Sequence, residues 1–245
     1  MQIIDVSSDA ECGSTEVAEI LRVAEEGVLR PLMCKCSDGR IYFFKPLGTG
    51  GWPLCLEWVC ARLGRALGLR IPNYRQVRLD EDLASAWNEQ GYVRQLEPGV
   101  GFGSQAVANP SEIDAANINT MALALRHRII WFDWWIRNSD RRRGRNPNAL
   151  WSSAESCCYL FDHEKAGDSG DSTAFWLDHL CASARGVIDP ALVAEMRTLL
   201  SLRHELRGEL PSAWTSNAAA LDWFFTHLET SLTGPNFGNW TEYHE

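Results

Sequence analysis

Lysine is scarce in this sequence, so each lysine is informative. Of 245 residues only three are lysine, at Lys35, Lys45 and Lys165, whereas twenty are arginine. A lysine at a position where a phosphate would need a cation is therefore stronger evidence of function than it would be in a lysine-rich chain. The chain as a whole is acidic, with a formal net charge of −9 at pH 7. Because no overall positive field would attract nucleic acid, we expect no nucleic-acid partner.

Two further absences bear on location. No apolar run approaches the roughly 20 residues of a membrane-spanning helix, and the first residues lack the charged-then-apolar pattern of a secretory signal. We therefore expect a cytoplasmic protein with no membrane partner, whose eight cysteines stay reduced. Neither Cys34-x-Cys36 nor the adjacent Cys157 and Cys158 has a usual zinc spacing, which favours core packing over a metal site.

The common phosphate-binding motifs are missing too. Residues 48–51 are glycine-rich but match neither GxGxxG nor GxxxxGK[ST], which favours a flexible connection. An apolar content of 45% in a chain of this length is enough for a sizeable core, in one large domain or two lobes.

Apolar spacing and turn residues predict an order of elements. Residues 14–26 have apolar side chains at helical spacing and predict a helix that Gly27 ends. We expect a hairpin turning at residues 37–39 and a break at residues 97–103, which separates a strand-rich part from a helical part. The other expected strands are residues 74–79 and 91–96, and residues 151–161 are expected to contain a short strand or a hairpin. The other expected helices are residues 52–68, 120–138, 171–184, 189–205 and 216–232, with Ser111 capping the helical region that precedes residue 120.

Lys45 and Glu57 form the first candidate constellation. Lys45 ends an apolar strand, YFFK, where a cation points into the cleft above a sheet and can hold phosphates. Glu57 follows twelve residues later between Leu56 and Trp58, so it is expected to be partly buried and paired with the lysine. The alternative is an exposed lysine and an exposed glutamate, and we favour the pair.

The second constellation lies in residues 138–150, NSDRRRGRNPNAL. It holds one carboxylate, Asp140, and two amides, Asn146 and Asn148, and a later apolar run, CCYLF, leads to Asp162. Mg²⁺-dependent phosphoryl transfer needs this set, because one acid takes the nucleophile's proton while an amide oxygen and a second acid hold the metal. The alternative interpretation is a helix end, an arginine-rich loop and a strand.

Several neighbours compete for a role. Asp133, among tryptophans, is interpreted as a core carboxylate bonded to the loop rather than a catalyst. The loop's arginines suit phosphate, an acidic substrate or RNA, and Arg141 is the one we expect to function, because it is adjacent to Asp140. His163 is assigned to local structure, because Mg²⁺ prefers oxygen ligands.

These stretches, in this order, resemble the HipA-like kinases, especially their small single-domain members, and more distantly the phosphatidylinositol 3/4-kinase fold. The stretches that carry the resemblance are GVLRPLMCK, GRIYFFK, LCLEWVCARLGRALGLRIPNY, NSDRRRGRNPNALW and YLFDHEKAG. The resemblance implies a single domain over residues 1–245 with an α+β, two-lobed protein-kinase-like fold. Its small antiparallel-sheet N-lobe would cover about residues 14–97, and its mainly helical C-lobe about residues 98–245.

The resemblance also implies ATP and Mg²⁺, a protein Ser/Thr acceptor, and a regulatory or antitoxin partner. The nucleotide loop would fall at residues 27–31. By this resemblance, Lys45 with Glu57 and Arg30 would bind the phosphates, and Gln95 and Leu96 would form the hinge that binds adenine. Asp140 would be the catalytic aspartate. Asn146 and Asp162 would bind the metal.

One departure concerns the spacing after Asp140. The usual distance from the catalytic aspartate to the metal-binding asparagine is about five residues, whereas here Asn146 is six residues on and Asn148 eight. One residue, Arg143 or Gly144, looks inserted, which leaves Asn146 and Asn148 as alternative ligands. The departure motivates a second hypothesis, a pseudokinase that binds nucleotide or a partner without turnover. A lipid or small-molecule kinase is a third hypothesis, by analogy of fold alone.

Overall fold

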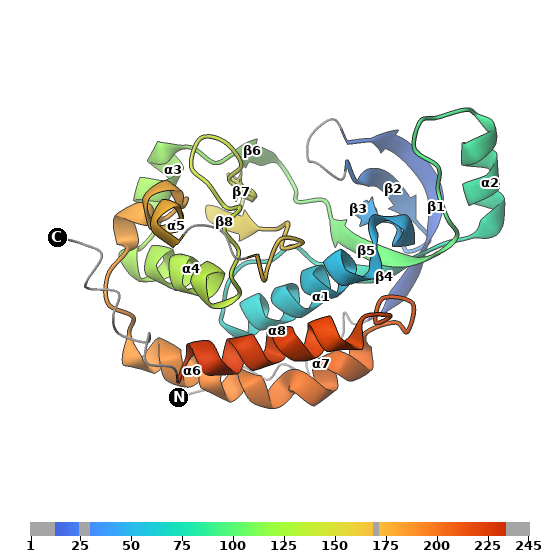
Figure 1. Ribbon diagram of the computed structural model, residues 1–245. Coiled ribbons are helices and arrows are strands. Elements are labelled where there is room, and N and C mark those ends of the chain that lie inside the picture. The colour runs from blue at the N-terminus through green and yellow to red at the C-terminus, as the bar shows by residue number, and fades with distance from the viewer. Residues whose placement is uncertain (1–12, 25–29, 169–171, 234–245) are drawn as a thin grey trace. The chain divides into compact units, whose positions relative to one another are not determined.

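The structure is a computed structural model that describes residues 13–24, 30–168 and 172–233. It confirms the α+β class, since helices and strands both recur along the chain (Figure 1). The chain divides into two compact units, and each is described by itself. The first comprises Met1–Trp58, Pro72–Val107 and Leu210–Asn217, and the second comprises Val59–Ile71, Ala108–Glu209 and Ala218–Glu245.

The first unit contains a closed five-stranded barrel. Its strands follow the order β1 (Ser14–Val23), β2 (Leu32–Cys36), β3 (Ile41–Lys45), β5 (Gly99–Gln105) and β4 (Tyr74–Leu79). Neighbouring strands pair antiparallel except β1 and β4, which pair in parallel and close the ring. The expected antiparallel sheet is therefore corrected to a barrel with one parallel pairing.

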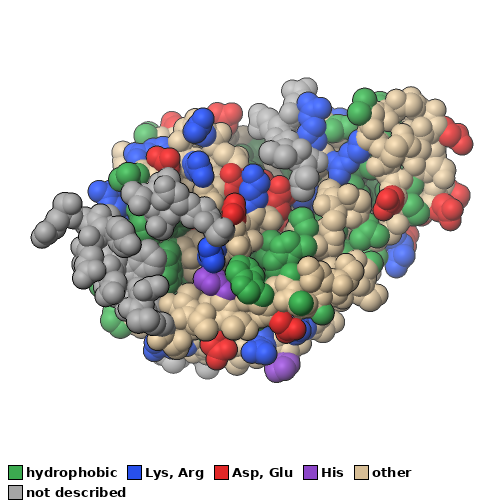
Figure 2. Space-filling model, in the orientation of Figure 1, with side chains coloured by type: hydrophobic (Ala, Val, Ile, Leu, Met, Phe, Trp, Pro, Cys, Tyr) green, Lys and Arg blue, Asp and Glu red, His purple; other side chains and the backbone are tan. Residues whose placement is uncertain are grey.

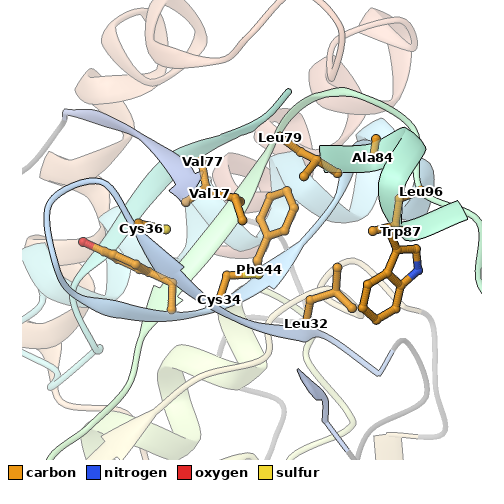
Figure 3. Packing of buried hydrophobic residues seen from close by; sticks show 11 residues of the cluster. Val17, Leu32, Cys34, Cys36, Phe44, Val77, Leu79, Ala84, Trp87 and Leu96 are labelled. Carbon is orange, nitrogen blue, oxygen red and sulfur yellow. The ribbon is translucent and has the colours of Figure 1, made fainter. Parts of the chain in front are cut away.

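Side chains that alternate along the strands fill the barrel, as the period of two along a strand requires (Figure 3). Burial raises the pKa of Cys34 and of Cys36 to about 12, so both thiols stay protonated and act as core side chains, as the sequence predicts. The cluster comprises Val17, Leu32, Cys34, Cys36, Tyr42, Phe44, Val77, Leu79, Ala84, Trp87 and Leu96.

Two expected elements of the first unit are wrong. The expected helix at residues 14–26 is strand β1 as far as Val23, and its expected end at Gly27 lies outside the described residues. The expected strand at residues 91–96 is irregular, and the break expected at residues 97–103 is instead strand β5. The hairpin turn between β2 and β3 is confirmed, with Gly39 at φ 79°.

Helices α1 (Gly51–Ala66) and α2 (Glu81–Glu89) complete this part of the chain. The expected helix at residues 52–68 is confirmed as α1, whose residues up to Trp58 belong to the first unit and the rest to the second. Helix α2 was not expected from its polar sequence. Asp80 caps it by accepting a hydrogen bond from Leu83 N–H at 2.7 Å.

The second unit is mainly helical and has one small antiparallel sheet. Helix α4 (Leu123–Trp135) is buried over most of its last two turns, which confirms the expected core helix. The cap expected at Ser111 is wrong, since Ser111 lies in β6 and Asp114 caps α3. The sheet order is β6 (Pro110–Glu112), β7 (Ala149–Ser152), β8 (Cys157–Leu160), and the other helices are α3 (Ala115–Thr120), α5 (Ser172–Asp178), α6 (Pro190–Leu199), α7 (Arg203–Glu209) and α8 (Ala218–Ser231).

The helices α6 and α8 and the β7–β8 hairpin confirm elements expected from the sequence. The expected helix at residues 189–205 is interrupted, because a 3₁₀ turn at Leu200–Leu202 separates α6 from α7. No helix among the described residues combines the length and the apolarity needed to cross a lipid bilayer.

Candidate functional site

Lys45 and Glu57 form a buried ion pair in the first unit. Lys45 Nζ lies 2.5 Å from Glu57 Oε1, and the two side chains are 10% and 2% exposed. Strand β3 delivers the lysine and helix α1 delivers the glutamate. Taking both charges out of water costs free energy that their attraction has to offset. An ammonium held in this way keeps donors in a fixed place, which is what an anionic ligand requires.

The strand beside Lys45 has a constraint of its own. Lys45 pairs with Phe102 of β5, and a Cβ added to Gly101 would lie 2.2 Å from the backbone oxygen of Lys45. Only glycine lets the two backbones approach so closely. The glycine-rich sequence of β5 therefore fixes the position of the lysine's own backbone.

The other candidates of the first unit have different surroundings. Arg30 is exposed with φ 42°, and its carbonyl accepts a hydrogen bond from Arg94 Nη1 at 2.7 Å. Residues 27–29 of the expected nucleotide loop lie outside the described residues. Gln95 is exposed and donates to the carbonyl of Tyr92 at 3.1 Å.

Leu96 is buried and its backbone is occupied. Its N–H donates to Asn88 Oδ1 at 2.8 Å, and its carbonyl accepts from Asn88 Nδ2 at 2.9 Å. A hinge residue meets adenine through these same two backbone groups. In this structure Leu96 connects α2 to the barrel core instead.

Asp140 and two asparagines come together in the second unit. Asp140 Oδ2 accepts hydrogen bonds from Asn146 Nδ2 at 2.7 Å and from Asn148 Nδ2 at 3.3 Å. Both amides turn their nitrogen toward the carboxylate, and among the described residues neither amide oxygen accepts a hydrogen bond. Within the described part of the chain, neither oxygen is therefore occupied by a protein donor. A neutral amide beside a carboxylate is a ligand set that suits Mg²⁺.

The residues between Asp140 and Asn146 belong to a closed loop. The N–H of Arg142 donates to the carbonyl of Asn146 at 2.7 Å, and Gly144 turns the chain with φ 72°. The neck of this small loop is therefore closed, and Gly144 lies near its tip. The hydrogen bond between Asn146 and Asp140 forms despite the longer spacing.

The β7–β8 hairpin pairs the backbone of Asn148 with that of Phe161, which directly precedes Asp162. Ala149 pairs with Leu160, and Phe161 N–H donates to the carbonyl of Asn148 at 3.1 Å. Asn148 and Asp162 have φ values of 43° and 60°, a left-handed conformation that costs free energy for residues other than glycine. Residues with backbone strain of this kind are often found at functional sites, so the two at this end of the hairpin mark it as a candidate site.

A buried network lies behind Asp140. Arg141 is fully buried, and its Nε donates to Asp133 Oδ2 at 2.7 Å. His179 Nε2 bonds the same oxygen at 2.9 Å, and Asn138 Nδ2 donates to Asp133 Oδ1 at 3.1 Å. Asp133 is therefore the core carboxylate that the sequence predicts.

Arg141 corrects the sequence interpretation. Its guanidinium bonds the carbonyls of Asn148 and Phe161 as well as Asp133, so it is not available to bind phosphate. It fixes the backbone on both sides of the hairpin end instead. His163, whose Nε2 lies 3.3 Å from Arg141 Nη2, also belongs to this buried structure.

The electrostatics of the network favour a permanent charge on Asp133. Burial opposes ionisation of the carboxyl, but the Arg141 guanidinium and His179 together hold the pKa of Asp133 well below its usual range. Burial also lowers the pKa of His179, although Asp133 partly opposes this, so the ring stays neutral near pH 7. His179 has no motif around it, so sequence reasoning gave no signal for its role.

The sequence also matches a known protein family. The sequence profile described as HipA-like kinase matches residues 17–237, which is most of the chain. The fold and this match together indicate a phosphotransferase of the kinase type. The chain belongs to the HipA-like kinase family, as its sequence motifs predict. No curated protein matches it.

Proposed function

We propose that the protein transfers the γ-phosphoryl group of ATP, with Mg²⁺, to a serine or threonine of a protein, and that its two units are the lobes of a kinase fold. The observation that carries the proposal is the triad of Asp140, Asn146 and Asn148. A carboxylate held by two amide nitrogens, with the amide oxygens left open, suits proton transfer beside a metal site. The buried pair of Lys45 and Glu57 supplies a second phosphate-binding element.

The roles follow from chemistry. Asp140 orients the acceptor hydroxyl and takes its proton as the oxygen attacks the γ-phosphorus. Lys45 holds the phosphates, and Glu57 keeps the ammonium in place. Asp162 and one asparagine oxygen would hold Mg²⁺, which would neutralise charge on the phosphates when bound. Arg141 does not contact the substrate and acts by holding the backbone of Asn148.

Adenine recognition fits the segment after β5 better than Leu96. Both backbone groups of Leu96 are bonded to Asn88. Strand β5 is the neighbour of Lys45's strand, and Val107, just beyond it, has no hydrogen-bond partner for its N–H or its carbonyl among the described residues. These backbone groups remain available to adenine. Val107→Pro, which removes the N–H, is therefore expected to weaken ATP binding more than Gln95→Ala.

The central test is phosphoryl transfer itself. The wild-type chain, ATP and Mg²⁺ are incubated with labelled γ-phosphate and a mixed serine and threonine peptide library. Asp140→Ala is expected to lower transfer by about 100-fold or more, the usual share of a general base. Asp168→Ala removes an exposed carboxylate of the same unit and is the matched control. Transfer that is equal in both variants contradicts the role of Asp140.

The metal ligand is identified by a paired measurement. Asn146→Ala and Asn148→Ala are compared for the Mg²⁺ concentration that gives half-maximal transfer. The variant that loses the ligand oxygen needs more Mg²⁺, whereas the other loses only a hydrogen bond to Asp140. If neither variant changes the Mg²⁺ requirement, the assignment of both asparagines is wrong.

A pseudokinase is the second candidate, and the extra residue between Asp140 and Asn146 favours it. In that case ATP and Mg²⁺ bind, but no phosphate reaches any peptide or the protein itself. Binding without transfer under conditions that saturate the site supports this candidate over the first.

A further inference from the structure

The loop from Arg142 to Asn146 has a fixed backbone. Its neck is closed by the hydrogen bond between Arg142 N–H and the Asn146 carbonyl, at 2.7 Å. Near its tip, the N–H of Arg143 donates to the carbonyl of Asp178 at 2.9 Å, at the end of helix α5. The loop backbone is thus held at its neck and near its tip. A ligand that binds here would therefore lose little free energy to the ordering of flexible chain.

Two arginines on this loop have no bonded partner. Arg143 and Arg145 are exposed, and among the described residues neither side chain makes an ion pair or a hydrogen bond. The arginines around them are engaged, since Arg141 binds Asp133 and Arg142 Nε donates to the carbonyl of Ser139 at 3.0 Å. The structure therefore uses two arginines internally and presents two outward.

The outward arginines are close to Asp140. Arg145 precedes Asn146, whose amide is bonded to Asp140 at 2.7 Å. Arg143 is three residues from Asp140, which limits the distance between their Cα atoms to about 11 Å even for an extended chain. An acceptor hydroxyl at Asp140 would have its flanking residues within reach of both guanidinium groups.

We propose that Arg143 and Arg145 form a specificity site, which selects serine or threonine acceptors flanked by aspartate or glutamate. The inference rests on the proposed phosphotransferase function and names its substrate class. Guanidinium groups pair with carboxylates through two parallel hydrogen bonds, and this geometry discriminates better than charge alone.

Nucleic acid fits this site less well than an acidic peptide. Binding to a phosphate backbone needs a continuous positive surface. On the face drawn in Figure 2, lysine and arginine side chains are interspersed with acidic ones, and the chain carries a net charge of −9. Two isolated arginines suit a short run of carboxylates.

The test compares three peptides that share one serine and differ only in its flanks, which are Glu, Ala or Lys. They are measured with the wild-type chain and with the double variant Arg143→Glu/Arg145→Glu. Arg22→Glu/Arg78→Glu makes the same change of charge at two exposed arginines of β1 and β4 and is the matched control. Autophosphorylation and circular dichroism are measured for each chain.

The wild-type chain is expected to prefer the Glu peptide. Loss of an exposed ion pair corresponds to up to about a five-fold change for each arginine, so kcat/KM for the Glu peptide should fall by up to about 25-fold in the reversed variant, through KM. The same variant should gain activity on the Lys peptide, which a merely misfolded loop would not do. The control variant should retain the wild-type order of peptides.

Three outcomes overturn the proposal in distinguishable ways. Equal transfer to the Glu and Ala peptides by the wild-type chain removes the specificity site and leaves the phosphotransferase function intact. Competition of transfer to the Glu peptide by RNA, but not by a Glu-rich peptide lacking serine, assigns the arginines to nucleic acid. No transfer to any peptide and no autophosphorylation removes the proposed function and the inference together.

Discussion

Asp140 and Arg141 are adjacent in the chain but differ in exposure. Asp140 is partly exposed, and its hydrogen-bond partners among the described residues are the side-chain amides of Asn138, Asn146 and Asn148. Arg141 is instead fully buried among charged and carbonyl groups. A run of arginines gives no sign of which member is buried. Arg141 is the buried member because Asp133, on helix α4, forms an ion pair with it. Only the folded chain determines which arginine of the run meets Asp133.

Removing Arg141 should destabilise the second unit strongly. Arg141→Met leaves Asp133 as a buried carboxylate with the His179 ring and the Asn138 amide, and breaking a buried pair of this kind costs about 3–5 kcal/mol. Urea denaturation measures the loss. Arg143→Met, two residues away and exposed, is the control and should change stability by less than about 0.5 kcal/mol. Similar losses in both variants would contradict the buried network.

His227 gives the second prediction at this scale. Its Nε2 is buried without a hydrogen-bond partner among the described residues, and burial together with Arg137 lowers its pKa to about 4 from 6.5. Between these pH values the unfolded chain binds a proton that the folded chain does not, so stability falls as the pH drops from about 6.5 toward 4.

His227→Phe should remove this contribution while keeping an aromatic ring beside Trp223. The melting temperature of the variant, relative to wild type, should therefore rise more at pH 5 than at pH 7.5. His204→Phe, which replaces an exposed histidine of the same unit, is the matched control. The assignment fails if the two variants respond to pH alike.

Among the secondary-structure elements, strand β1 shows why one helix was predicted wrongly. Its pairing with β2 shifts register twice, between Val17 and Glu19 and between Ile20 and Arg22. Each bulge adds a residue and moves the inward-facing positions from a spacing of two to a spacing of three. Val17, Ile20 and Val23 then mimic the spacing of a helix.

Strand β5 was missed for the opposite reason. Its glycines at positions 99, 101 and 103 are typical of a break in the chain. In the barrel they are needed, because side chains there would collide with Lys45, Leu47 and Val77. By contrast β3, α1 and the Lys45–Glu57 pair were predictable, since apolar periodicity and a strand-end lysine are local features.

Gly101→Ala tests this interpretation. The new Cβ would lie 2.2 Å from the Lys45 carbonyl oxygen, so β3 or β5 must shift, at a cost of about 1–3 kcal/mol. Because the shift moves Lys45, ATP binding should weaken as well. Gly48→Ala is the control, since its Cβ meets no atom within 4 Å. Stability and ATP affinity that do not differ between the two variants would contradict the close approach.

For the whole molecule, the sequence predicted the α+β class but not the closed barrel. Closure depends on pairing Ser14–Glu16 with Gln76–Arg78, some sixty residues away, which no local pattern specifies. The first unit likewise includes Leu210–Asn217, where Trp214 Nε1 donates to the Val100 carbonyl at 2.7 Å. Contacts between residues so far apart in the sequence produce no periodic pattern of apolar residues, so they cannot be predicted from the sequence in this way.

Ligand binding should stabilise the molecule only when both ATP and Mg²⁺ are present. At a concentration one hundred times the dissociation constant, a ligand that binds the folded state stabilises it by about 2.7 kcal/mol. Thermal unfolding is measured with ATP, with Mg²⁺, with both, and with both plus a chelator. Lys45→Met should reduce the shift. No shift at millimolar ATP and Mg²⁺ would contradict the kinase and the pseudokinase alike.

The closed barrel also limits how a partner can be recruited. Many regulatory peptides bind by adding a strand to a sheet that has a row of unpaired backbone groups along one side. Each strand of this barrel has two neighbouring strands, although β1 pairs with β4 and with β2 over different stretches. Both bulges lie in the stretch of β1 that pairs with β2 alone. Bulges discourage such strand addition. A regulator of the first unit would therefore have to recognise side chains, and its specificity would depend on surface chemistry rather than on backbone pairing.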